Sequence, residues 1–349
     1  MNTTSGTLDE ALLRLHSAGP EFRGYLSNHG PMAVEAMVRN GQAGSVHRWL
    51  DAYADKLEDV PAARSRITDA NWPEALGDPS RVTDWTGYFT EKVAERPWRE
   101  LLTEWWPRLL PGIAGAATHP VIRVGHTVRS LLTDGEDAVL IAELAHALGY
   151  WAARHLPLPT AVHPTGGATP SEALSALPRI TDQQVTPVEG YAQLASLPGW
   201  LSTAESLHLP DDPEAVRQGL TALVRAAALS YAHHGHRNGI MLVHAATAPN
   251  AVLRTLPALP RHLWARSFSA AWAASSAITT LYAADAPRPA PSAEAVTPEE
   301  VFERAVAHGN EHAIKFADTA LDIAATSEDG DTGALSAALN ALAQIDKDD

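Results

Sequence analysis

Residues 263–283 read LWARSFSAAWAASSAITTLYA, and this stretch indicates the fold class. It carries a single charged side chain, Arg266, and it is rich in alanine, the residue with the highest helix propensity. A helix that is apolar around its whole circumference is normally enclosed by other elements. We therefore expect 263–283 to be a central helix of a helical protein.

Helical periodicity extends from this stretch toward both ends of the chain. Apolar positions three and four residues apart, bounded by start and stop signals, predict further helices. Their ranges are 8–16, 31–39, 46–57, 84–95, 98–110, 119–132, 137–155, 213–234, 240–246, 298–325 and 332–345. No alternating strand pattern longer than a few residues and no fixed-period repeat accompanies them. The prediction is a mainly α protein, with a single large multi-helix domain over residues 1–349 and long loops.

Two segments interrupt the helical pattern. Residues 156–187 are rich in proline, glycine and threonine, which predicts a long loop suited to covering a site. Residues 284–297 are rich in proline and alanine and predict a connector between helices.

Charge and cysteine content exclude several classes of protein and of site. The net charge of −15 argues against a nucleic-acid binder and against a partner such as an anionic membrane surface. The absence of cysteine excludes disulfides and thiolate metal sites, so a metal would take nitrogen and oxygen ligands. No signal-peptide pattern is visible, and no apolar run approaches the roughly 18–20 residues of a membrane span. We expect a cytoplasmic protein; the sequence does not indicate an oligomeric state.

The segment GNEHAIKF, residues 309–316, places an imidazole and an amine on one helix face. His312 and Lys315 are three residues apart, so their side chains point the same way from a helix that otherwise looks buried. A buried amine is tolerable if it is neutral, paired or chemically modified. The alternative is a salt-bridged helix surface, since His308 and Asp318 fall on the same face. The pattern alone leaves both interpretations open.

Three more histidines occupy positions where a functional role and a structural role are both possible. His29 precedes a helix at a Gly-Pro turn, His119 opens an apolar helix, and His244 is the single polar side chain within 239–246. The structural alternatives are a cap, a ring bonded to the backbone, and a hydrogen-bonded core histidine. His126 lies two turns after His119 on about the same face.

The remaining histidine patterns are weaker. Glu143 and His146 form a Glu-x-x-His pair, but a carboxylate-bridged di-metal site needs a second such pair, so we expect a buried ion pair instead. His233, His234 and His236 resemble a helix end followed by a solvated turn. The sequence contains no His-Glu-x-x-His zinc motif, no dinucleotide-binding glycine motif after a strand and no nucleophile elbow.

Taken in order, four short segments resemble the questin oxidase-like family. They are NHGPM at 28–32, HPVIRVG at 119–125, MLVH at 241–244 and GNEHAIKF at 309–316. The resemblance implies O2-dependent oxidation of polycyclic aromatic polyketides, with ring opening of anthraquinones by a Baeyer–Villiger-type or dioxygenase-type reaction. It also implies a non-haem iron centre with several histidines and an unusual lysine, and NADPH as a candidate second cofactor.

Carried over residue by residue, the resemblance implies the metal ligands His29, His119, His244, His312 and Lys315. Four imidazoles suit iron among other divalent metals. An ammonium group has no lone pair, so a ligating lysine must be deprotonated or modified. Our hypothesis is that Lys315 is N-carboxylated and binds Fe(II).

Other roles follow from the same resemblance. The candidate acid–base residues are His126, His146 and His234, because imidazole titrates near neutral pH. The candidate walls of an apolar substrate pocket, each of which is also explained by ordinary core packing, are Trp72, Trp151, Trp264 and Tyr231. The chain departs from the family at Arg123, where many members have histidine, which puts the substrate in doubt.

Two other functions remain as alternatives to an oxygenase. One is a helical binding or scaffold protein for a hydrophobic small molecule or a partner protein, without catalysis. The other is a hydrolase that uses the same metal ligands.

Overall fold

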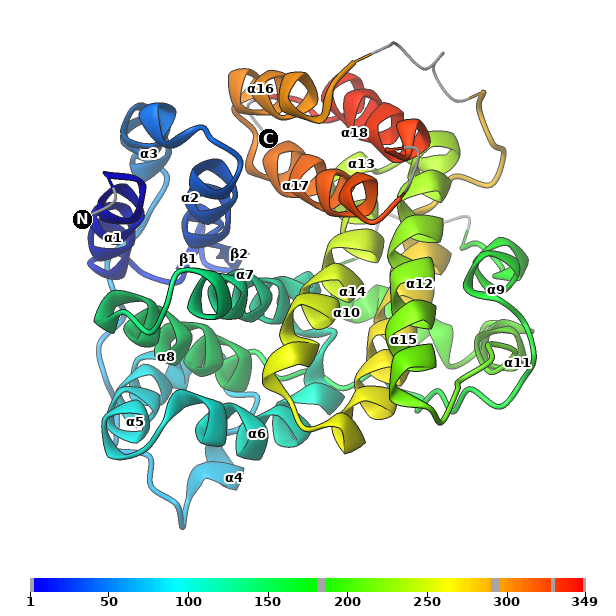
Figure 1. Ribbon diagram of the computed structural model, residues 1–349. Helices are drawn as coiled ribbons and strands as arrows, with labels where there is room; N and C mark the ends of the chain where they lie inside the picture. Colours follow the sequence, from blue (N-terminus) through cyan, green and yellow to red (C-terminus); the bar gives the residue numbers. More distant parts are fainter. Residues whose placement is uncertain (1–2, 181–185, 290–295, 328–329, 348–349) are drawn as a thin grey trace. The chain divides into compact units, whose positions relative to one another are not determined.

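The computed structural model describes residues 3–180, 186–289, 296–327 and 330–347 (Figure 1). These residues are mainly helical, and the single sheet among them is a hairpin of two short strands, which confirms the predicted mainly α class. No helix in the described part of the chain is long and apolar enough to span a membrane. The chain forms two compact units. Unit 1 is Met1–Pro157 with Arg254–Pro260, and unit 2 is Leu158–Leu253 with Arg261–Asp349.

Unit 1 is built on four helices that pack in sequence: α5 lies along α8, α8 along α7, and α7 against α2. Its core contains a cluster of aromatic rings on α5 and α6, in which Trp105 lies 5.6 Å from Trp85 and 4.9 Å from Phe89, measured between ring centroids. The elements are α1 (Thr3–His16), β1 (Glu21–Phe22), β2 (Leu26–Ser27), α2 (Gly30–Arg39), α3 (Val46–Ala54), α4 (Trp72–Ala75), α5 (Val82–Glu95), α6 (Trp98–Leu109), α7 (His119–Thr133) and α8 (Ala138–Ala153).

Unit 2 is organised around α12, which contacts α9, α15, α17 and α18. The apolar stretch that indicates the fold class forms α15, whose Phe268 and Trp272 are fully buried. The elements are α9 (Pro170–Ala176), α10 (Pro187–Leu194), α11 (Trp200–Ala204), α12 (Pro213–His234), α13 (Gly239–Leu242), α14 (His244–Thr255, ending in unit 1), α15 (Trp264–Tyr282), α16 (Pro298–His308), α17 (Glu311–Ala325) and α18 (Thr332–Gln344).

The predicted helix over 298–325 is wrong, because the chain forms two helices there. Gly309 has φ 91° and ends α16, since glycine adopts this left-handed conformation at little cost. Asn310 then caps α17 by accepting the backbone N–H of His312 at 2.9 Å. The segment that carries two proposed ligands therefore starts a new helix.

Other boundaries also differ from the prediction. The helix expected at 240–246 is the short α13 followed by the beginning of α14, which continues to Thr255. The loop expected over 156–187 contains the short helix α9, whose N-cap Thr169 forms a capping box with Glu172. Residues 181–185 of that loop and 290–295 of the 284–297 connector lie outside the described residues.

Candidate functional site

Two of the predicted metal ligands lie together in unit 1. His29 directly precedes α2, where its backbone N–H donates to the hydroxyl of Tyr53 at 2.7 Å, and His119 is the first residue of α7. Both side chains are buried, and their Nε2 atoms are 2.7 Å apart. This distance is that of a hydrogen bond between the two rings.

The backbone in front of His119 explains how its ring is oriented. Ala116, Ala117 and Thr118 have φ values of 44°, 52° and 69°, so three consecutive non-glycine residues are left-handed. This turn places the carbonyl oxygen of Ala116 at 2.6 Å from Nδ1 of His119. Because a carbonyl only accepts, Nδ1 carries the proton and the lone pair of neutral His119 is on Nε2. Metal-binding histidines usually show this arrangement.

Close packing against the end of α8 holds this turn in place. A Cβ on Gly115 would lie 1.8 Å from the carbonyl oxygen of Arg154, so this position requires glycine. Beside it, the backbone N–H of Leu156 donates to the carbonyl of Gly112. The backbone directly before the left-handed turn is therefore held against the end of α8.

The other three predicted ligands belong to unit 2. His244 is the first residue of α14 and is fully buried. Its Nδ1 lies 3.1 Å from the carbonyl oxygen of Met241, so its lone pair is also on Nε2. The ring of His312, in the first turn of α17, lies edge-on to His244 with 5.4 Å between ring centroids.

Lys315 lies one turn after His312 and is only 1% exposed. Its Nζ has no hydrogen-bond partner among the described residues. Burial lowers the pKa of Lys315 to about 7, although the nearby carboxylate of Glu311 acts in the opposite direction. Burial, together with the charge of Lys315, lowers the pKa of His244 to about 3. An amine in this setting is more readily neutral than an ordinary lysine.

The alternative interpretation of this segment as a salt-bridged helix surface is wrong. Lys315 and Asp318 are both buried on α17. His308 is on a different helix, α16, where its Nε2 donates to the carbonyl oxygen of Ile345 at 3.0 Å.

His126, a predicted acid–base residue, is buried within a network of charged groups in unit 1. Its Nδ1 donates to Glu35 on α2 at 2.6 Å, and Arg254 donates to its Nε2 at 3.4 Å. Burial alone would raise the pKa of Glu35, but Arg129 and His126 lower it to about 2. Burial lowers the pKa of His126, and both of its ring nitrogens are engaged by charged neighbours.

The ion pair expected between Glu143 and His146 is wrong. Arg123 donates to both carboxylate oxygens of Glu143, at 2.5 and 2.7 Å, and Nε2 of His16 donates to the same carboxylate at 2.7 Å. Burial opposes ionisation of Glu143, but the Arg123 guanidinium holds the pKa of this carboxyl far below its usual range. Arg123 and His16 together occupy this carboxylate, which also removes the di-metal interpretation.

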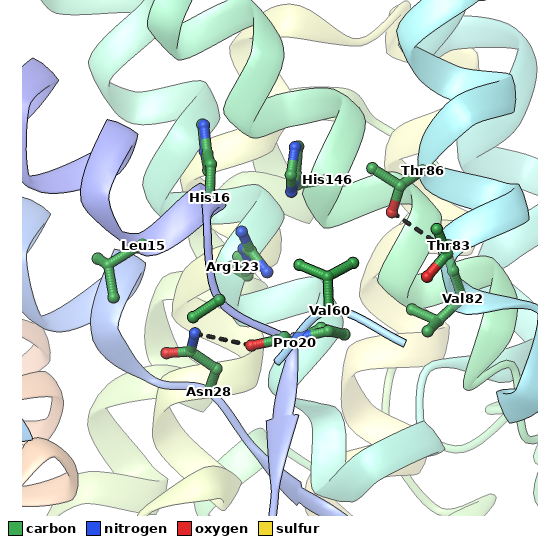
Figure 2. A pocket seen from close by; sticks show the side chains of 12 residues that line it. Leu15, His16, Pro20, Asn28, Val60, Val82, Thr83, Thr86, Arg123 and His146 are labelled. Carbon is green, nitrogen blue, oxygen red and sulfur yellow. Dashed lines mark hydrogen bonds between the residues drawn. The ribbon is translucent and has the colours of Figure 1, made fainter. Parts of the chain in front are cut away.

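His146 instead stacks on His16, with 4.2 Å between ring centroids and 16° between ring planes. Figure 2 shows the two rings side by side at a cavity of about 60 Å³ that Arg123 also lines. Burial and the charges of His16 and Arg123 lower the pKa of His146 to about 3. A cavity of this size has room for a few water molecules and none for a polycyclic ring system.

A family model, questin oxidase-like, matches residues 26–320. The chain belongs to the questin oxidase-like family. No curated protein matches the chain.

The family match covers most of both units and includes every predicted ligand. It identifies the chain as a member of an oxidoreductase-like enzyme family, which suggests a small aromatic substrate. The assignment of individual residues to metal or substrate remains a prediction, as does the single domain over 1–349.

His234, the third predicted acid–base residue of this questin oxidase-like chain, lies at the end of α12 in unit 2. Its Nδ1 donates to the carbonyl oxygen of Ala284 at 2.7 Å, and the neighbouring His233 donates to that of Arg288 at 2.9 Å. These bonds attach the connector after α15 to α12. Burial lowers the pKa of His234.

The aromatic residues predicted as pocket walls are mostly packed against other rings. Trp151 is also fully buried, whereas Trp264 is half-buried. The ring pairs are Trp72–Trp105, Trp151–Trp106 and Tyr231–Phe316, with centroids 5.0, 5.3 and 4.6 Å apart. Core packing therefore explains Trp72, Trp151 and Tyr231 without a substrate.

Sequence reasoning missed two features of the site. Glu35 lies in an apolar segment, and its apolar neighbours were a signal that this carboxylate is buried. Thr118 precedes His119, is fully buried and does not cap α7, but threonine carries no sequence signal for a left-handed conformation.

Proposed function

We propose that this chain is a metal- and O2-dependent oxidoreductase that oxidises or cleaves a ring of a polycyclic aromatic polyketide such as an anthraquinone. The observation that carries the proposal is the buried donor set. His119 and His244 are both buried, and each has Nδ1–H on a backbone carbonyl and a lone pair on Nε2. Family membership supplies the class of reaction.

The residues fit a divalent metal ion, which we propose to be Fe(II). The proposed ligands are His29, His119, His244, His312 and Lys315. Nitrogen-rich neutral donors suit iron, and His119 and His244 satisfy the usual requirement that the second ring nitrogen is fixed, in both cases by a backbone carbonyl. When bound, the iron would supply the activation of O2 that an organic side chain lacks.

We propose further that Lys315 is N-carboxylated. The neutral amine would attack the carbon of CO2, forming an N–C bond and releasing one proton, so that the product carries one negative charge. The support is that Nζ is buried and has no hydrogen-bond partner among the described residues. A carbamate would provide an anionic oxygen ligand and offset part of the charge of the metal.

The three acid–base candidates differ in what their surroundings permit. Both ring nitrogens of His126 are engaged by charged neighbours, which favours a positioning role. His146 lines a cavity with room for a few water molecules, but burial and the charges of His16 and Arg123 lower its pKa to about 3, which makes it a weak base at neutral pH. His234 attaches the connector to α12.

The electron balance decides whether NADPH is a second cofactor. Insertion of both atoms of O2 into the substrate needs no external electrons. Insertion of one atom, with the other reduced to water, needs two electrons, for which NADPH is the proposed donor. Measuring NADPH consumed per O2 consumed distinguishes the two: a ratio of zero favours the dioxygenase-type reaction.

Metal analysis of protein purified without a histidine tag tests the proposal. We expect about one iron per chain, since buried ligands hold metal tightly. His119→Ala and His312→Ala should each remove it, because each substitution deletes a proposed ligand. Near-zero metal after reconstitution, or full occupancy in both variants, contradicts the proposed ligands.

A second function, binding of a hydrophobic small molecule without catalysis, is favoured by a groove in unit 2. It lies between α9 and α12 and has a volume of about 350 Å³, within the usual range for organic ligands. The residues that line it include the apolar Leu174, Ala226 and Leu229 and the polar Arg225 and Ser230. Metal-free protein that binds 2,6-dihydroxynaphthalene in this groove, with loss of binding in Ala226→Trp, would support this function.

A further inference from the structure

Thr118 combines three unfavourable features at one position. Its φ of 69° is an outlier for a β-branched residue. It occupies the N-cap position of α7, where a threonine hydroxyl normally accepts a backbone N–H, yet it makes no such bond. Its hydroxyl is fully buried and has no hydrogen-bond partner among the described residues.

Two other threonines on helices of the same unit bond their hydroxyls to the backbone. Thr127, further along α7, is also buried, and its hydroxyl donates to the carbonyl oxygen of Arg123 at 2.9 Å. The half-buried Thr86 on α5 donates in the same way to the carbonyl oxygen of Val82 at 3.0 Å. Within a helix, the carbonyl oxygen four residues earlier is available to accept a bond from a threonine hydroxyl. The left-handed turn before α7 removes this acceptor at Thr118.

Thr118 directly precedes the proposed ligand His119 in the chain. In the same left-handed turn, the carbonyl oxygen of Ala116 accepts a hydrogen bond from Nδ1 of His119. The lone pair of His119 is therefore on Nε2. One backbone conformation thus orients a proposed ligand and frees the adjacent hydroxyl. We infer that the Thr118 hydroxyl donates a hydrogen bond to a small hydrogen-bond-accepting ligand, such as azide, held at His119.

A buried hydroxyl near a proposed ligand is also present among the described residues of unit 2. Thr247 follows His244 by three residues on α14, so the two side chains share a face. It is buried, and its hydroxyl has no hydrogen-bond partner among the described residues, although its backbone N–H donates to Val243. A buried hydroxyl beside a proposed ligand is therefore found in each unit.

The inference rests on the proposed function, because it takes His119 as a metal ligand. It is tested with full-length protein loaded with Co(II) and titrated with azide, whose terminal nitrogen accepts hydrogen bonds. Thr118→Val keeps the shape and removes the hydroxyl. We expect unchanged cobalt content, an unchanged or higher Tm of the metal-free protein, and azide binding weakened about tenfold.

Matched variants separate a ligand-binding hydroxyl from a structural one. Thr118→Ser retains the hydroxyl and should bind azide within about twofold of the native chain. Thr127→Val removes a satisfied hydroxyl from the same helix and should leave azide affinity unchanged. If Thr118→Val does not fold, Thr118→Ala replaces it in the same comparison with Thr118→Ser.

Three results would overturn the inference. They are native azide affinity in Thr118→Val, loss of stability in metal-free Thr118→Val, and failure of Thr118→Ser to restore binding. Retention of cobalt by His119→Ala is a different result, because it contradicts the proposed ligands rather than the role of Thr118.

Discussion

Glu143 in unit 1 and Lys315 in unit 2 are both ionisable side chains on buried helix faces, but their surroundings differ. Arg123 and His16 hold Glu143 with charge-assisted hydrogen bonds of 2.5 to 2.7 Å. Lys315 is equally buried, and its Nζ has no hydrogen-bond partner among the described residues. A buried charge with its partners in place belongs to the architecture, whereas a buried amine without one indicates chemistry that the fold alone does not explain.

Glu35 is a second buried carboxylate of unit 1 that has its partners in place, like Glu143. Arg129, His126 and Ser130 all bond its carboxylate. Unit 1 therefore contains two carboxylates that link helices of its core, Glu35 between α2 and α7 and Glu143 between α7 and α8. Substitutions in these networks should affect stability, and substitutions at Lys315 should affect metal binding.

The largest expected effect follows from removing the partner of Glu143. Arg123→Ala leaves this carboxylate buried without its main cation, and we expect the free energy of unfolding to fall by about 3–5 kcal/mol. Urea denaturation at neutral pH measures the change. The double variant Arg123→Met with Glu143→Leu removes both charges and should recover most of the loss. A cost below about 1 kcal/mol for Arg123→Ala would mean that Glu143 is not a structural charge.

Low pH should destabilise the protein by protonating its buried, paired carboxylates. The folded-state pKa of Glu35 is about 2, below its ordinary value of 4.5. A depressed carboxylate pKa stabilises the fold above the unfolded pKa, and this stabilisation is lost as pH falls through the folded value. The difference amounts to about 3 kcal/mol, lost between about pH 4.5 and pH 2. Burial lowers the pKa of His126, which adds a loss of the same sign below its ordinary value of 6.5.

This expectation is tested by urea denaturation of the native protein and of the Glu35→Gln variant at several pH values. The variant should be less stable at neutral pH but should lose less stability between pH 5 and pH 2. Parallel curves for the two proteins would show that Glu35 does not contribute to acid unfolding.

Lys315→Met should change the free energy of unfolding in the opposite direction and stabilise the metal-free protein. It replaces a buried amine that lacks a hydrogen-bond partner among the described residues by an apolar chain of similar length. We expect the metal-free protein to gain about 1 kcal/mol of stability, since burying an unbonded polar group costs at least that much. The same variant should lose bound metal. A less stable metal-free protein with normal metal content would place Lys315 with the structural charges.

The contrast between Glu143 and Lys315 also shows what the sequence can predict. Apolar periodicity predicted the boundaries of α12, because these depend on local spacing. It left open whether Lys315 lies on a buried face or on a salt-bridged surface, and the structure shows that Lys315 is buried. The partner of Glu143 depends on packing between helices. The nearby His146 was therefore the wrong choice, and Arg123, on the preceding helix, is the observed one.

Local signals were also present but outweighed at the break between α16 and α17. Gly309 and Asn310 are a typical helix end and a typical helix start, yet the apolar pattern on either side suggested one continuous helix. The left-handed turn before His119 had no signal at all, since alanine and threonine disfavour that conformation. Packing of Gly115 against Arg154 accounts for it only in the folded protein.

The smallest expected effect concerns the left-handed turn before His119. It tests whether this backbone conformation costs stability, as the burial of the Lys315 amine does. Ala117 has a φ of 52°, and glycine adopts that conformation without a Cβ clash. Ala117→Gly should raise the free energy of unfolding by about 0.5–1 kcal/mol, the relief being partly offset by greater freedom of the unfolded chain. Ala114, three residues earlier with a φ of −75°, is the matched control, and Ala114→Gly should lower stability by a similar amount. Equal destabilisation by both substitutions would show that the turn is unstrained, and the conformation of Thr118 would then need no functional explanation.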